Sequence, residues 1–314
     1  MGKKNISDKK TKNKKIGIIL LFSVLILALA YSFTFNSNFS VITSDTSVVE
    51  PVTSISMSDY LDDYFKFHTI PLNIGDPYFD TYFTERDFNR IQQNLPAPVD
   101  GIKLIINESS KELIDILKPN DGTVVVYPTF TSAAYGEPGF YTYFGGGCDE
   151  SCITDLSFEN VDIKYTSSGT TAQILYAVGY DFVTDIDVDK NPKILQNYDT
   201  VILLHNEYVT KKMFDAITSH PHLIFLAPNA LYAEIDVNYD DNTMTLIRGH
   251  QYPPPESPAN GFDYGIEQEF HHYEYDAECL EWEFIEIENG FHLNCYPDGV
   301  LPQNLDILLK MKDL

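Results

Sequence analysis

A histidine and a glutamate lie two positions apart, directly after a short apolar run. The run is Val201 to Leu204, and His205-Asn206-Glu207-Tyr208 follows it. Tyrosine and asparagine side chains follow three other apolar runs in the same way. Imidazole, carboxylate, phenol and amide groups can bind a metal ion or move protons when they converge. The candidate site residues are His205, Glu207, Tyr135, Tyr165 and Asn229.

The elements expected to position these residues are five short strands and two helices. Apolar runs bounded by turn residues predict strands at 123–127, 161–164, 181–184, 200–204 and 223–227. Apolar spacing predicts helices at 170–178 and 210–218, the second with Thr210 as its N-cap. The alternation predicts an α/β fold with a mainly parallel sheet, in which ligands bind beyond the carboxyl ends of the strands.

After Asn229 the pattern changes to antiparallel hairpins. One is expected at 234–239 and 243–248, around Asp240-Asp241-Asn242, and another at 280–287 and 291–295, around Asn289-Gly290. Residues 236–314 are therefore predicted to form an antiparallel β extension of a core at 121–235. The tight turn at Asn289-Gly290 would pair Cys295 with Phe284, and this register brings no second cysteine opposite Cys295.

Three blocks of sequence resemble the large (beta) subunit of N,N-dimethylformamidase and its relatives. They are TFTSAAYG at 129–136, the stretch that ends in LLHNEYVTKKMFDAI at 203–217, and HLIFLAPNALY at 222–232. The resemblance covers roughly residues 121 to 235. It implies a flavodoxin-like or class I glutamine amidotransferase-like sheet and metal-dependent hydrolysis of a small amide.

The resemblance also implies a site for iron. In that family two tyrosines and a glutamate hold the ion, which places Glu207 as the carboxylate ligand, with Tyr135 and Tyr165 as the phenolates. His205 and Asn229 would then act in catalysis or bind the substrate. Hard oxygen ligands of this kind suit Fe(III), and three protein ligands leave positions for water and an amide oxygen.

Several features depart from the family pattern. The chain is much shorter, Tyr165 to Gly169 replaces the usual Arg-Pro, and a glycine run at 145–147 precedes a cysteine. A glutamine amidotransferase would need a cysteine on a tight glycine-flanked turn, and none of the four cysteines has that setting. Two functions stay open: a metal-dependent amidohydrolase, and a non-catalytic surface module for binding or for structure.

The N-terminus carries a membrane-targeting signal. Residues 16–35 form an uncharged run of 20 residues, long enough to cross a bilayer, and seven lysines precede it in the tail at 1–15. The excess of positive charge predicts a cytoplasmic tail, a linker at 36–55 and a globular domain at 56–314 outside the cytoplasm. Alternatively, Ala28-Leu29-Ala30 fits a signal-peptide cleavage site, with secretion after cleavage following Ala30.

The predicted exported part is strongly acidic and holds all four cysteines. Removing the seven lysines and one aspartate of the tail from 21 basic and 46 acidic residues leaves 14 and 45, a formal charge of −31. This charge argues against nucleic acid as a partner. Cys148/Cys152 and Cys279/Cys295 predict two local disulfides in an oxidising compartment, with a zinc site as the alternative.

Overall fold

The computed structural model describes residues 57–95, 100–159, 163–250, 252–253, 262 and 278–314. The predicted tail, membrane segment and linker lie outside the described residues, as does the first half of the expected strand at 161–164. Within the described ranges, no helix is both long enough and apolar enough to cross a membrane.

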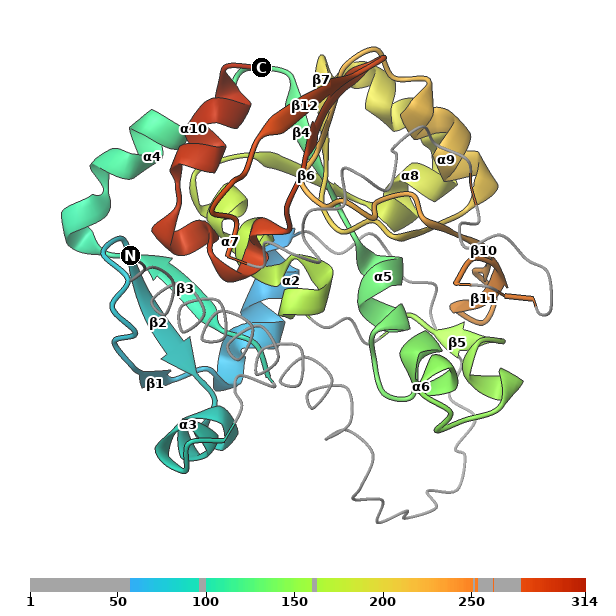
Figure 1. Cartoon of the computed structure of the whole chain (residues 1–314), viewed down its shortest axis with the longest axis horizontal. Coiled ribbons are helices and arrows are strands. Elements are labelled where there is room, and N and C mark those ends of the chain that lie inside the picture. Colours follow the sequence, from blue (N-terminus) through green and yellow to red (C-terminus); the bar gives the residue numbers. More distant parts are fainter. Residues whose placement is uncertain (1–56, 96–99, 160–162, 251, 254–261, 263–277) are drawn as a thin grey trace, which may run out of the picture. The chain divides into compact units, whose positions relative to one another are not determined.

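A six-stranded sheet forms the centre of the described domain (Figure 1). Its order is β12 (Phe284–Ile287), β13 (Gly290–Leu293), β9 (Leu223–Phe225), β7 (Thr200–Leu203), β4 (Thr123–Tyr127) and β6 (Asp181–Thr184). All neighbours from β13 to β6 pair in parallel, and β12 is the antiparallel edge. The expected mixed α/β architecture with a mainly parallel sheet is therefore confirmed.

Two apolar cores lie on the two faces of this sheet. Val124 and Val126 belong to one core, whereas Val125 and Tyr127 belong to the other, because successive side chains of β4 point to opposite faces. Helices α8 (Asp185–Lys190) and α9 (Lys211–Thr218) cover the first face, and α4 (Glu112–Leu117), α7 (Gly169–Ala177) and α10 (Asp306–Lys312) cover the second. Burial on both faces explains why β4 is a continuous apolar run.

The helix that follows the His205–Tyr208 segment begins where the sequence predicts. Thr210 is the N-cap of α9, and its hydroxyl accepts a hydrogen bond of 3.1 Å from the backbone N–H of Met213. The same hydroxyl donates to Asp189 at 2.5 Å, which ties α9 to α8. The cap fixes where the chain leaves the candidate site.

A second sheet joins the candidate site to the first C-terminal hairpin. Its order is β5 (Leu156–Ser157), β11 (Thr243–Arg248), β10 (Ala233–Asn238) and β8 (Tyr208–Val209). The predicted hairpin is confirmed as β10 and β11, but β10 also pairs in parallel with β8, which begins at Tyr208. This hairpin is therefore joined to the core through β8, which directly follows Glu207.

The last predicted hairpin is also formed, as β12 and β13, and it extends the central sheet beyond β9. In β12 and β13, Ile287 pairs with Gly290, so the two-residue turn is Glu288-Asn289 and not the expected Asn289-Gly290. β13 also pairs in parallel with β9, with Gly290 opposite Leu223. The backbone N–H of Leu223 donates to the carbonyl of Asn289 at 2.9 Å, which fixes the turn against β9.

A third sheet is antiparallel and lies N-terminal to the core in the sequence. It consists of β1 (Ile70–Pro71), β2 (Phe79–Phe83) and β3 (Lys103–Ile106), with α2 (Met57–Tyr64) before it and α3 (Glu85–Gln92) after β2. Phe65 and Phe79 contribute to the core that α7 also borders. Several aromatic residues of this region therefore pack against the domain.

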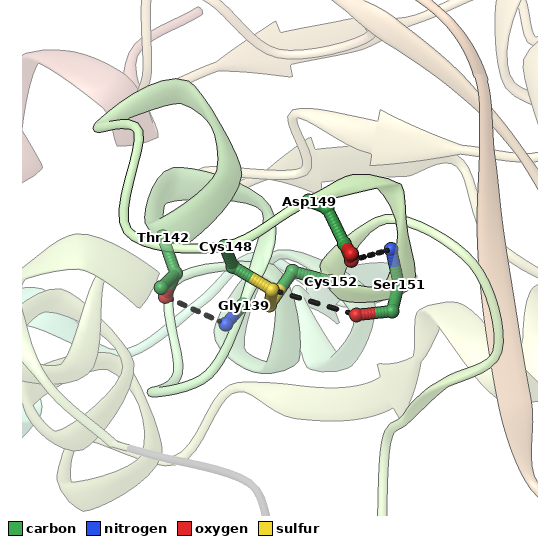
Figure 2. The surroundings of a disulfide bond; sticks show 6 residues. All are labelled: Gly139, Thr142, Cys148, Asp149, Ser151 and Cys152. Carbon is green, nitrogen blue, oxygen red and sulfur yellow. Dashed lines mark hydrogen bonds between the residues drawn. A yellow bond between two sulfur atoms is a disulfide. The ribbon is translucent and has the colours of Figure 1, made fainter.

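Both expected disulfides are formed. Cys148 is bonded to Cys152, and Cys279 to Cys295. Figure 2 shows the first bridge beside the turn in which the Asp149 carboxylate accepts a hydrogen bond from the Ser151 N–H at 3.0 Å. Since each sulfur is bonded to its partner, the alternative of a zinc site at these cysteines is wrong.

The expected strand at 161–164 is not formed by its described residues. Ile163 and Lys164 lie outside any strand, and a 3-10 helix, η5 (Tyr165–Ser167), follows them. The Gly169 N–H donates to the Lys164 carbonyl at 2.9 Å, and Ser168 adopts a left-handed conformation with φ of 54°. Local hydrogen bonding in this serine-rich turn has replaced strand pairing.

We predict that Gly290→Ala lowers the free energy of unfolding by about 1–3 kcal/mol, the usual cost of overpacking. A β-carbon at Gly290 would overlap the backbone carbonyl of Leu223 on β9. Gly147→Ala is the matched control, because a β-carbon there makes ordinary contacts with Thr142. Chemical denaturation measures both variants, and equal stabilities would contradict the close pairing of β13 with β9.

Candidate functional site

The candidate site lies at the carboxyl ends of β4 and β7, which are neighbours in the sheet. β7 ends at Leu203, and His205-Asn206-Glu207 leads from it into β8. β4 leads into α5 (Thr129–Ala134), with Tyr135 as the residue that ends the helix. The topology therefore brings the predicted His205, Glu207 and Tyr135 to the same edge of the sheet, as expected for a parallel α/β sheet.

Backbone hydrogen bonds hold the Glu207 segment in place. The hydroxyl of Thr131 on α5 is buried and accepts from the N–H groups of Glu207 and Tyr208, at 2.9 and 3.3 Å. The Glu207 carbonyl accepts from the N–H groups of Tyr232 and Ala233, at 3.0 and 2.8 Å. The N–H groups and the carbonyl group of the segment are thus hydrogen-bonded to elements that lie far apart in the sequence.

The beginning of α5 is fixed by a buried carboxyl group. Asp185, at the start of α8, accepts a hydrogen bond of 2.9 Å from the Phe130 N–H. Burial raises the pKa of Asp185 to about 8, although hydrogen bonds from Phe130 and Thr129 act in the opposite direction. This contact connects the ends of β4 and β6 and places Thr131 beneath Glu207.

The Glu207 carboxylate is fully buried and contacts four side chains. Its Oε2 accepts from the Tyr135 hydroxyl at 2.9 Å and lies 3.2 Å from His205 Nε2. Its Oε1 lies 2.6 Å from His250 Nε2 and accepts from the Tyr141 hydroxyl at 3.2 Å. A buried carboxylate with two phenols and two imidazoles is a concentrated set of polar groups in an apolar surrounding.

The tautomer of His205 follows from its surroundings. Its Nδ1 lies 2.7 Å from the carbonyl oxygen of Thr166, which only accepts, so Nδ1 carries a hydrogen. Its backbone N–H donates to the Ser168 hydroxyl at 3.0 Å. The Nε2 atom lies 3.2 Å from Glu207 Oε2, so it donates to the carboxylate when the ring is protonated and presents a lone pair to the site when the ring is neutral. A lone pair next to a carboxylate suits a bound cation or a proton in transit.

Electrostatics separate the two kinds of acid in the cluster. Burial acts to raise the pKa of Glu207, but hydrogen bonds and charge from His205 and His250 outweigh it and lower the pKa to about 2. Burial first, and then the charge of Glu207, raise the pKa of Tyr135 and of Tyr141 well above its ordinary value. At neutral pH, Glu207 is therefore ionised and both phenols keep their protons.

The oxygen atoms of the cluster are spaced as ligands of a single ion would be. The Tyr135 and Tyr141 hydroxyls lie 2.7 Å apart, and they lie 2.9 and 3.2 Å from Oε2 and Oε1 of Glu207. Neighbouring ligands at about 2.0–2.1 Å from an octahedral ion are separated by about 2.9 Å. In the described ranges no group of three or more His, Cys, Asp or Glu side chains is arranged to hold a metal, so tyrosine oxygens would have to complete the site.

Tyr165 and Asn229 lie apart from the Glu207 contacts. Tyr165 is 53% exposed, and its ring packs on that of Tyr296, with 5.0 Å between ring centroids. The Tyr296 ring lies 5.2 Å from that of His205, so Tyr165 borders the site through Tyr296. Asn229 is half-buried in the turn after β9, and among the described contacts its side chain does not touch the cluster.

The sequence did not identify Tyr141 or His250 as site residues. Tyr141 comes from α6 (Phe140–Phe144) and stacks on Tyr135, with 4.1 Å between ring centroids. His250 follows β11 and reaches Glu207 because β10 pairs with β8. A signal existed for Tyr141, since GFYTYF at 139–144 places aromatic residues soon after Tyr135, but His250 stands in no local pattern.

A comparison with protein-family models identifies a family that matches about half of the chain. The N,N-dimethylformamidase beta subunit-like, C-terminal family matches residues 110–264, which include β4, β7, α5, α6 and the β10–β11 hairpin. The matched range therefore contains Tyr135, Tyr141, His205, Glu207 and His250. Among curated proteins, none matches the chain. Residues 110–264 are thus an N,N-dimethylformamidase beta subunit-like, C-terminal domain, as the sequence blocks predicted.

Proposed function

We propose that this domain is a metal-dependent amidohydrolase in which Glu207, Tyr135 and Tyr141 bind an iron ion. The observation that carries the proposal is the buried Glu207 carboxylate, with two phenol oxygens within 3.2 Å of it. Carboxylate and phenolate are hard oxygen donors that suit Fe(III). The family match supports the reaction class, since the matched family is named for an amide-cleaving enzyme.

The second tyrosine ligand in this proposal is Tyr141 in place of Tyr165. Tyr141 contacts both Glu207 and Tyr135, whereas the ring contact of Tyr165 is with Tyr296. Tyr141 is also 37% exposed, which places one ligand where a small amide can approach. Tyr165 remains a candidate for contact with the substrate at the edge of the site.

The residues of the chain then have separate roles. A hard ion supplies polarisation of an amide carbonyl and a lower pKa for water. His205 Nε2 accepts a proton from the attacking water and returns it to the departing amine, while the Nδ1–H bond to Thr166 keeps the ring oriented. Asn229 is proposed to bind the substrate from the turn after β9, the strand next to β7.

We extend the proposal to the fold family and the location. The parallel run of β9, β7, β4 and β6, with helices on both faces, supports a flavodoxin-like or class I glutamine amidotransferase-like core. Two disulfides support an oxidising compartment. Residues 16–35 are proposed to anchor the domain outside the cytoplasm, with secretion after cleavage following Ala30 as the alternative.

The metal content of the full-length chain, purified without chelators, tests the function. We expect near-stoichiometric iron by elemental mass spectrometry, lost in Glu207→Gln because the variant keeps the shape and removes the charge. Tyr135→Phe and Tyr141→Phe should weaken iron binding, and Tyr165→Phe should retain it. The iron-loaded wild type should also release amine or ammonia from small amides.

Two results would contradict parts of this proposal. Loss of iron in Tyr165→Phe but not in Tyr141→Phe would restore Tyr165 as the ligand that the sequence resemblance implied. A wild-type protein that binds neither iron nor any other ion would favour the alternative, a non-catalytic surface module on the same fold.

The location has its own test. External protease applied to intact cells that express the full chain should digest the globular domain and spare the N-terminal tail. Mass spectrometry of the mature N-terminus then separates a retained anchor from a protein that begins at Tyr31. Recovery of the domain in the cytosol with reduced cysteines would contradict export.

A further inference from the structure

The β10–β11 hairpin delivers a second histidine to Glu207, in a fixed orientation. His250 lies two residues beyond β11 and has a left-handed backbone with φ of 51°. At the base of the hairpin, Arg248 pairs with Glu234 at 2.6 Å. The neighbouring Gly249 forms an antiparallel bridge with Tyr252. These contacts fix the backbone on both sides of His250.

The ring of His250 is held by four aromatic neighbours, one of which is Tyr141, with 5.7 Å between ring centroids. It stacks on Tyr208 at an interplanar angle of 25°, and its centroid lies 4.9 Å from that of Phe144 and 4.7 Å from that of Tyr232. Its exposed fraction is 21%, so the ring is mostly enclosed. With the ring held in this way, Nε2 points at Glu207 Oε1 from 2.6 Å.

The two oxygens of Glu207 therefore have different surroundings. An ionised carboxylate only accepts hydrogen bonds, so the hydrogen between the two groups lies on His250 Nε2 and is donated to Oε1. The Oε2 atom faces Tyr135 and His205 Nε2, which carries no hydrogen in the neutral tautomer. Metal binding by the two tyrosines would displace the phenol protons of Tyr135 from Oε2 and of Tyr141 from Oε1, but the imidazole N–H of His250 would remain on Oε1.

We infer that His250 is a positioning residue that occupies Oε1 of Glu207 and restricts this carboxylate to binding an ion through Oε2 alone. The inference rests on the proposed function, because it concerns the same ion. A carboxylate that binds through one oxygen takes up one coordination position of the ion, whereas one that binds through two takes up two. Binding through one oxygen therefore leaves an additional position for water or an amide oxygen. Hydrogen-bonded partners of metal-binding carboxylates commonly set metal affinity by about 10–100-fold.

The test compares His250→Ala with His250→Gln in the full-length chain, with Fe(III) supplied as its citrate complex. Gln places an amide N–H close to the position of His250 Nε2, so it should retain most of the affinity. We expect His250→Ala to weaken Fe(III) binding by about 10–100-fold. His222→Ala is the control, because His222 lies in a cavity with Thr200 and Met311, outside the Glu207 contacts.

Infrared difference spectra of the iron-loaded proteins supply a readout that a merely structural role would not change. Carboxylate stretching bands distinguish binding through one oxygen from binding through two. We expect one-oxygen binding in the wild type and in His250→Gln, and two-oxygen binding in His250→Ala. Thermal unfolding of the metal-free variants confirms that each is folded before it is loaded.

Three outcomes distinguish a failure of the role inferred for His250 from a failure of the proposed iron site. Two-oxygen binding in the wild type would overturn the role of His250 and leave the iron site in place. Equal affinity and equal spectra in wild type and His250→Ala would do the same. A wild-type protein that binds no Fe(III) would overturn the proposed function, and the inference that rests on it would fall as well.

Discussion

The buried negative charge of Glu207 is the constraint on which the rest of the site depends. A carboxylate removed from water is costly unless hydrogen bonds and opposite charges compensate it. Here the compensation comes from the hydroxyls of Tyr135 and Tyr141 and from the two imidazoles of His205 and His250. Each partner comes from a different element, so α5, α6, the β7–β8 segment and the β10–β11 hairpin must all be placed correctly around one carboxylate.

This requirement explains several features of the fold that otherwise look unrelated. The parallel pairing of β8 with β10 brings the hairpin to the carboxyl end of β7. Thr131 holds the backbone of Glu207 from α5, and the carboxyl group of Asp185 holds the beginning of that helix. The turn at Thr166 and Ser168 fixes His205 from the opposite direction. The central sheet thus provides a rigid edge, and the loops and short helices that follow its strands carry the side chains of the candidate site.

The sequence predicted the parts of this arrangement that have a local signal. Apolar runs identified β4, β6, β7 and β9, the cap at Thr210 identified α9, and cysteine spacing identified both disulfides. Glu207, His205 and Tyr135 were found because they follow strands. Tyr141 and His250 were missed because their proximity to Glu207 arises from tertiary packing. Residues 163 and 164, the described part of the strand expected at 161–164, form no strand because Ser167 and Ser168 favour a hydrogen-bonded turn, which leaves Tyr165 at the surface.

The ionisation of Glu207 can be measured directly with carboxyl-carbon NMR of the metal-free chain labelled at glutamate, with Glu207→Gln to assign the signal. The structure predicts that this carboxyl group remains ionised as the pH falls below 4 and titrates near pH 2, because the imidazoles of His205 and His250 outweigh burial. A Glu207 signal that titrates at or above the ordinary pKa of 4.5 would show that the two imidazoles do not outweigh burial. That result would contradict the central role of its charge.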